Sequence, residues 1–133
     1  IFAPDYPLAS LKSVTPKVLA EHEFISREPG SGTRSITDAY FSQHKIPPES
    51  LKTLIELGSP EALKSVVASG LGFAIVSRAI VEKERQLGTL KAIPLKPSLK
   101  RSLSLIYPES RFQSRLSSTF IDFAKRQLKE AAL

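Results

Sequence analysis

Cysteine is absent from the chain, and histidine occurs only twice, as His22 and His44. Without cysteine no disulfide and no thiolate metal site can form, which fits a reducing compartment. The two histidines stand far apart in the sequence, with no pattern of carboxylates beside them. We therefore interpret both as surface or helix-end residues and expect neither a metal site nor a histidine-based catalytic pair.

Long apolar runs are also missing. The longest, Leu71–Val76 and Phe120–Ala124, fall far short of the roughly 20 residues that a membrane-spanning helix needs. The chain opens on Ile1–Asp5 without the basic start and apolar stretch of a secretion signal, although a fragment could have lost one. We expect no membrane partner.

Motifs of catalysis and nucleotide binding are absent as well. There is no Gly-x4-Gly-Lys phosphate loop, no Gly-x-Ser-x-Gly elbow and no His-Glu-x-x-His motif. Gly70-Leu71-Gly72 imitates the start of a dinucleotide fingerprint, but it lies between a predicted helix and the next strand, the reverse of the order that pyrophosphate binding requires. We interpret Gly70 as a helix stop and Gly72 as a close packing point. The acidic residues are dispersed, so we expect no enzyme, no catalytic residue and no cofactor.

The 133 residues are enough for about one domain, and 41% apolar with 24% charged residues is typical of a globular protein. A net charge of +6 and a pI near 9.7 suggest a nucleic-acid partner. The cations, however, are scattered or gather late in a predicted helix, where the helix dipole favours them. Because no basic stripe with interleaved aromatic residues is present, we expect no direct contact of this chain with nucleic acid.

The chain is organised around residues 23–34. Phe24-Ile25 predicts a strand, the run 29–32 predicts a tight turn, and apolar residues at helical spacing predict a helix that follows the turn. The free amides of this turn would point toward the carboxyl end of the strand, a place for an anion or a polar small molecule. Ser31 and Thr33 either add hydroxyls to such a site or simply cap the helix.

Similar helix starts recur along the chain. Gly58-Ser59 followed by Pro60 is a turn, a cap and a first helical residue, and Ser77 precedes a third helix that Gly88 closes. The last helix is predicted to begin with Ser117 as its cap, with Leu116 and Ile121 as a hydrophobic staple. Further strands are predicted at 51–57, 73–76, 90–95 and 102–107.

The order is β, a short α, three βα repeats, then β, β, α. It predicts an α/β fold with a mostly parallel, Rossmann-like sheet flanked by helices. In such a sheet a ligand lies beyond the carboxyl ends of the strands, where three loops converge here, at 26–34, 58–59 and 77–78.

Two segments carry a family resemblance. Phe24–Arg34 (FISREPGSGTR), followed by Gly58–Val76 (GSPEALKSVVASGLGFAIV), resembles the effector-binding domain of LysR-type transcriptional regulators. Ala3–Ala9 is similar to the Pro-x-His-Pro-Leu-Ala segment of that family, with Tyr6 in place of the usual histidine, and 116–123 matches its last helix. The resemblance covers nearly the whole chain.

The resemblance implies part of a cytoplasmic bacterial regulator with a type II periplasmic-binding-protein-like fold. Residues 1–133 would be a partial effector-binding domain, with 14–95 as the second lobe and with 1–13 and 96–133 as hinge strands and part of the first lobe. The winged helix-turn-helix that binds promoter DNA, and the first half of the first lobe, would be missing. With its packing partner lost, the last helix would leave Phe120, Phe123 and Leu128 partly uncovered, so we expect a homo-oligomer.

The family's ligand-binding positions, carried over to this sequence, are Ser26, Ser31, Gly32, Thr33, Gly58 and Ser59. These positions suit a carboxylate, sulfate or phosphate as the effector, with Arg27 or Arg34 available for charge. Two alternatives stay open: a lobe of an extracytoplasmic solute-binding protein, and an α/β enzyme with a phosphate loop at 30–34.

Overall fold

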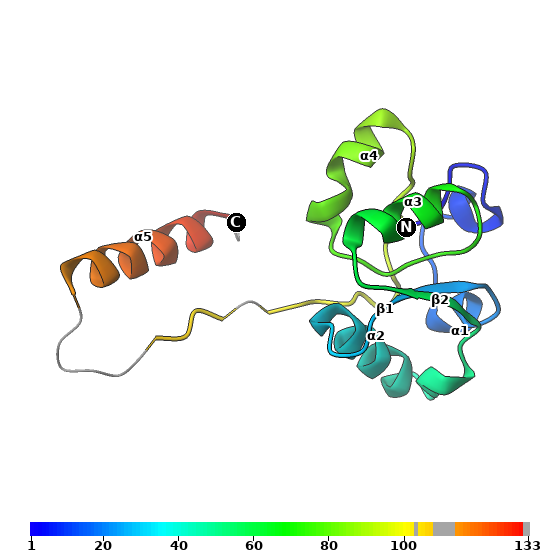
Figure 1. The fold of residues 1–133 in the computed structure, drawn as a ribbon, viewed down its shortest axis with the longest axis horizontal. Coiled ribbons are helices and arrows are strands. Elements are labelled where there is room, and N and C mark those ends of the chain that lie inside the picture. Colours follow the sequence, from blue (N-terminus) through cyan, green and yellow to red (C-terminus); the bar gives the residue numbers. More distant parts are fainter. Residues whose placement is uncertain (103, 108–113, 132–133) are drawn as a thin grey trace. The chain divides into compact units, whose positions relative to one another are not determined.

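The computed structural model describes residues 1–102, 104–107 and 114–131, in two compact units, Ile1–Arg101 and Ser102–Leu133 (Figure 1). Among its described residues the second unit holds one helix, α5 (Arg115–Ala131). In the first unit the elements follow the order η1 (Pro7–Ser10), α1 (Pro16–Leu19), β1 (Phe24–Arg27), α2 (Gly32–Gln43), η2 (Pro48–Ser50), β2 (Thr53–Leu57), α3 (Pro60–Ala68), η3 (Arg78–Val81) and α4 (Glu82–Leu87), where η marks a 3-10 helix. The α/β class predicted from the sequence is confirmed.

Strands β1 and β2 are neighbours and run in the same direction. Arg27, the last residue of β1, lies opposite Leu57, the last residue of β2. The two carboxyl ends therefore meet at one edge of the sheet, and the loops that follow them lead into α2 and α3. The parallel connection through a helix is as predicted.

The strands predicted at 73–76 and 90–95 are present only as isolated bridges, one in the first run and two in the second, where Leu95 is bridged in parallel to Val14. Phe73 is bridged in parallel to Phe24 of β1, and Lys91 exchanges two antiparallel backbone hydrogen bonds of 2.9 Å with Phe2. The run at 90–95 cannot form a continuous ladder because Pro94 has no N–H to donate. The carbonyl of Pro94 instead accepts a hydrogen bond of 3.1 Å from Val14.

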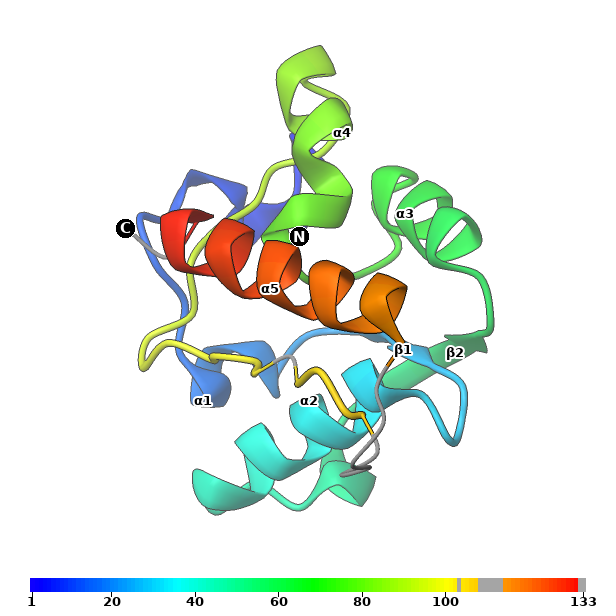
Figure 2. The ribbon, with the colours of Figure 1, turned by 90° about the vertical axis from the view of Figure 1, so that its left-hand side faces the viewer.

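Alternate side chains of the central strands pack on opposite faces of the sheet. Phe24 and Phe73 lie on one face, where their rings stack at 5.0 Å and pack near Phe41 of α2. Ile25 and Ala74 lie on the other face, in a cluster with residues of α3 and η3. Helices α1 and α2 thus cover one face, and α3 and α4 lie over the other (Figures 1 and 2). Both faces being covered explains why the run that begins at Phe73 is wholly apolar.

Two glycines shape the connection from α3 to the centre of the sheet. Gly70 follows α3 with a φ of +83°, a conformation that costs glycine little. Gly72 packs so tightly that a Cβ built on it would lie 2.4 Å from the carbonyl oxygen of Glu23. The interpretation of these glycines as a helix stop and a close packing point is confirmed.

The second unit differs from its prediction in two respects. Ser114, not Ser117, caps α5, because the Ser114 Oγ accepts a hydrogen bond of 3.1 Å from the Ser117 N–H. The proposed staple is therefore wrong, since Leu116 and Ile121 both lie inside the helix. The predicted strand at 102–107 is also wrong for 102 and 104–107, because none of these residues makes a ladder hydrogen bond. Residue 103 lies outside the described part.

Helix α5 presents large apolar side chains to solvent. Three that the sequence analysis expected to be uncovered are more than half exposed, namely Phe120, Phe123 and Leu128. Among the described helices, none is long and apolar enough to cross a bilayer.

Candidate functional site

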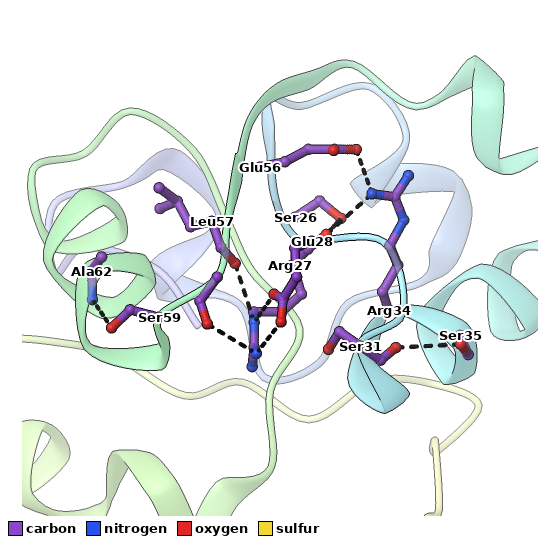
Figure 3. Close-up of polar contacts among 11 residues, drawn as sticks. Ser26, Arg27, Glu28, Ser31, Arg34, Ser35, Glu56, Leu57, Ser59 and Ala62 are labelled. Carbon is purple, nitrogen blue, oxygen red and sulfur yellow. Dashed lines mark hydrogen bonds and ion pairs between the residues drawn. The ribbon is translucent and has the colours of Figure 1, made fainter.

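Two of the three predicted loops lie side by side at the carboxyl edge of β1 and β2 (Figure 3). The first loop carries Ser31 and Gly32 into α2, and the second carries Gly58 and Ser59 into α3. The sequence pattern predicted that three loops converge at this edge, and two of the three do.

The Arg27 guanidinium lies between these two loops and is bound to protein groups through its Nε and Nη2. Its Nε and Nη2 donate to the Glu28 carboxylate at 2.7 and 2.9 Å, and they also donate to the carbonyls of Leu57 and Gly58 at 3.2 Å each (Figure 3). The bond to Glu28 raises the pKa of Arg27 and lowers the pKa of Glu28, so both stay charged and paired. Arg27 thus links the loop after β1, through Glu28, to the loop after β2, through the Gly58 carbonyl.

Arg34 is engaged in the same way on the other side of β1. Its Nη1 donates to the Arg27 carbonyl at 3.2 Å and pairs with the Glu56 carboxylate, and its Nε lies 3.6 Å from the Asp38 carboxylate. Neither arginine that the sequence analysis named as a source of charge has a free guanidinium.

The predicted hydroxyls differ in their roles. The Ser59 Oγ accepts a hydrogen bond of 3.3 Å from the Ala62 N–H, so it caps α3. Ser31 occupies the N-cap position of α2 but makes no side-chain cap bond, and it is buried. Ser26 is buried too, donates to the Arg27 carbonyl at 3.2 Å, and lines a separate hollow on the α2 side of β1. Thr33, in the first turn of α2, borders a larger cavity.

That larger cavity has a volume of about 660 Å³ and lies within the first unit. Its walls come from five parts of the chain: Ile1, the start of α2, the run 75–81, Arg85 of α4, and the segment 92–101. The third predicted loop, Ser77-Arg78, therefore borders the same cavity as Thr33, whereas Gly58 and Ser59 do not. Most of the lining is apolar, with Ile36, Ile75, Val81, Ile93 and Leu99 among its residues.

Three arginines stand among the lining residues: Arg78, Arg85 and Arg101. Arg85 pairs with Glu82 at 2.6 Å, whereas Arg78 and Arg101 make no hydrogen bond or ion pair with any described residue. The Arg101 guanidinium also lies close to the start of α2, 3.8 Å from where a Cβ on Gly32 would stand. Two unpaired cations and the positive end of a helix thus face one cavity, an arrangement that favours an anion.

The segment that carries Arg101 is held by α2. The Tyr40 hydroxyl donates a hydrogen bond of 2.7 Å to the Pro97 carbonyl, and burial raises the pKa of this tyrosine.

Sequence reasoning missed Arg85 and Arg101 as lining residues, because their place depends on how distant segments pack. No group of three or more potential metal ligands occurs among the described residues.

Residues 1–129 match the family profile described as LysR substrate binding domain. The chain is 36% identical over 120 residues to a RuBisCO operon transcriptional regulator of Acidithiobacillus ferrooxidans, an alignment that covers 90% of this chain and 38% of that protein. It is 40% identical over 123 residues to the uncharacterized HTH-type transcriptional regulator YeiE of Escherichia coli K12, covering 91% of this chain and 40% of the relative. The chain thus spans about two fifths of the length of these relatives.

Two solved structures are similar in fold. The Synechocystis PCC6803 CcmR regulatory domain, solved in complex with 2-PG, matches with a TM-score of 0.75 and 28% identity over 92% of this chain and 58% of that one. The effector binding domain of QuiR in complex with shikimate matches with a TM-score of 0.62 and 23% identity, covering 97% and 59% of the two chains. The second likeness shows the fold alone.

Proposed function

The chain belongs to the LysR substrate-binding domain family, and on this premise we propose that it senses a small anionic effector for a transcriptional regulator. The relatives are transcriptional regulators, and the fold is the periplasmic-binding-protein-like fold of LysR regulatory domains. In the proposed arrangement, 14–95 forms the second lobe, and 1–13 and 96–133 supply hinge strands and part of the first lobe. The whole regulator would act in the cytoplasm as a homo-oligomer on promoter DNA, through a separate domain and without catalysis.

The observation that carries this proposal is the cavity bordered by two arginines, Arg78 and Arg101, whose side chains have no partner among the described residues. A guanidinium has a permanent charge and N–H groups in a fork that matches a carboxylate or phosphate. The first N–H groups of α2, at Gly32 and Thr33, have no partner inside the helix and can donate to the same anion. The solved CcmR domain holds 2-PG, an anion, which agrees with this chemistry in a similar fold.

The same geometry suggests how binding could regulate. Arg78 lies on η3, Arg101 on the segment 92–101 and Thr33 on α2, so one anion would contact three separate parts of the chain. A ligand that contacts all three favours the arrangement in which they lie close together. Because affinities for effector and DNA are linked, this preference would change how tightly the whole regulator binds its promoter.

Among the residues predicted from the sequence, we propose Gly32 and Thr33 as direct contacts of the effector, through an amide and a hydroxyl. The other four predicted residues lie at the neighbouring edge and stay predictions, namely Ser26, Ser31, Gly58 and Ser59.

Isothermal titration of the chain with 2-PG, inorganic phosphate and sulfate tests the proposal. We expect saturable binding of at least one anion, and a loss of about ten- to a hundredfold in Arg78→Gln, since a hydrogen bond to a charged group contributes about 1.5 to 3 kcal/mol. Lys83→Gln is the matched control, because Lys83 is exposed on α4, does not line the cavity and loses the same charge. Absence of binding for all three anions, or equal losses in the two variants, would contradict the proposal.

A further inference from the structure

The η3–α4 segment, residues 78–87, carries two of the three cavity arginines but has little packing of its own. None of the six residues of α4 is buried, and Val81 is the buried residue of η3. Its backbone hydrogen bonds outside the helices are local, reaching only from Ser77 to Leu90. Val81 packs in the apolar cluster that holds Ile25 and Leu63, so the position of Arg78 and Arg85 depends on this one apolar contact and on what else ties the segment to the body of the unit.

Lys64 of α3 supplies that tie. Its Nζ donates to the Ile80 carbonyl at 3.3 Å and to the Glu84 Oε1 at 2.7 Å, and it also pairs with Glu61 at 2.9 Å. In the described part of the chain, no other hydrogen bond or ion pair joins 78–87 to a residue outside 77–90.

The Lys64–Glu84 pair is set apart from ordinary surface pairs by its burial. The side chains are only 9% and 19% exposed, and the second carboxylate oxygen of Glu84 is buried without a hydrogen-bond partner. Pairs on a surface contribute little, whereas removal of one partner from a buried pair leaves a charge without compensation. The hydrogen bond between them raises the pKa of Lys64 and lowers the pKa of Glu84, so both remain charged.

We propose that Lys64 is a positioning residue of the effector site, which holds the η3–α4 segment through Glu84 and the Ile80 carbonyl so that Arg78 and Arg85 line the cavity. The inference rests on the proposed function, because positioning matters only if Arg78 binds an anion. When the tie is lost, only a fraction of the molecules presents the arginines correctly. The apparent dissociation constant then rises by the inverse of that fraction.

The test uses three variants of the chain. Lys64→Met/Glu84→Met removes both ends of the tie without leaving one buried charge unpaired, which protects the fold. Glu61→Gln is the matched control, because it removes the other, 79% exposed partner of the same lysine, which lies on α3 itself. Glu84→Gln keeps an acceptor for the Lys64 Nζ and serves as the conservative replacement.

Titration with 2-PG, at a temperature below the unfolding transition of each variant, should show affinity reduced about tenfold in the double methionine variant. Glu61→Gln should stay within about twofold of the unchanged chain. Glu84→Gln, which keeps the hydrogen bond but loses the ion pair, should lose less affinity than the double methionine variant. Amide exchange at 80–87 should accelerate most in the double variant. A folded double variant that binds 2-PG with unchanged affinity would overturn the positioning role, even if its melting temperature falls. An unchanged chain that binds no anion would instead overturn the proposed function, and the exchange rates would still show whether Lys64 holds the segment.

Discussion

Replacement of Gly72 by alanine should destabilise the fold strongly, because the glycine lies against the backbone of the neighbouring strand. The new Cβ would stand 2.4 Å from the Glu23 carbonyl oxygen, about 1 Å closer than ordinary contact allows. That carbonyl accepts the Phe73 N–H at 2.9 Å, and the Phe73 carbonyl accepts the Ile25 N–H at 2.8 Å. A shift of about 1 Å would stretch these bonds beyond useful length.

The expected cost combines the overpacking with weakened buried hydrogen bonds and comes to about 3 kcal/mol. With a urea m-value of about 1.5 kcal/mol/M, the midpoint of unfolding should fall by about 2 M. Gly58→Ala is the control, because no atom lies within 4 Å of its Cβ and its φ is not positive, so the change should stay within about 0.5 kcal/mol. Equal urea midpoints for the two variants would refute the close packing inferred at Gly72.

Two further predictions concern the groups around the cavity. Tyr40→Phe removes the hydrogen bond to the Pro97 carbonyl. The free energy of unfolding, measured by urea titration at neutral pH, should fall by about 1 kcal/mol. An unchanged value would mean that this bond does not hold the segment 92–101. The Lys64 hydrogen bond lowers the pKa of Glu84 in the folded state. The charged Glu84 therefore stabilises the fold above the pKa of the unfolded chain, near 4.5, and this contribution is lost as pH falls through the folded pKa. The stability difference between the unchanged chain and Glu84→Gln, measured by urea titration at pH 7 and pH 3, should therefore shrink in acid, and a constant difference would argue against the charged pair.

Local chemistry made much of the fold predictable. Ser59, followed by a proline, caps α3 as expected, and Gly88 closes α4 in the left-handed conformation. The alternation at 102–107 failed as a predictor of a strand. Alternating apolar and polar residues indicate an extended segment with one apolar face, but a strand also needs a neighbouring segment with which its backbone can form hydrogen bonds. Ser117 failed as a cap because another serine three residues earlier offers the same chemistry.

The candidate site was less predictable than the fold. The meeting of the loops after β1 and β2 follows from parallel strands, and the sequence contained that information. Which arginines remain unpaired followed only in part. Glu28 is next to Arg27 in the sequence and Asp38 lies four residues after Arg34, but Glu56, the other acid at Arg34, comes from β2 and meets it only in the folded chain. Arg101 reaches the start of α2 on a segment that Tyr40 of α2 bonds at Pro97, a contact between residues far apart in the sequence.

The most direct test is nuclear magnetic resonance mapping of the isotope-labelled chain during titration with 2-PG. If the cavity holds the anion, the amides of Gly32, Thr33, Ser77 and Arg78 and the guanidinium of Arg101 should shift together and saturate at one dissociation constant. Saturation with shifts confined to Gly58 and Ser59, or no shift at millimolar 2-PG and phosphate, would contradict anion sensing by this cavity.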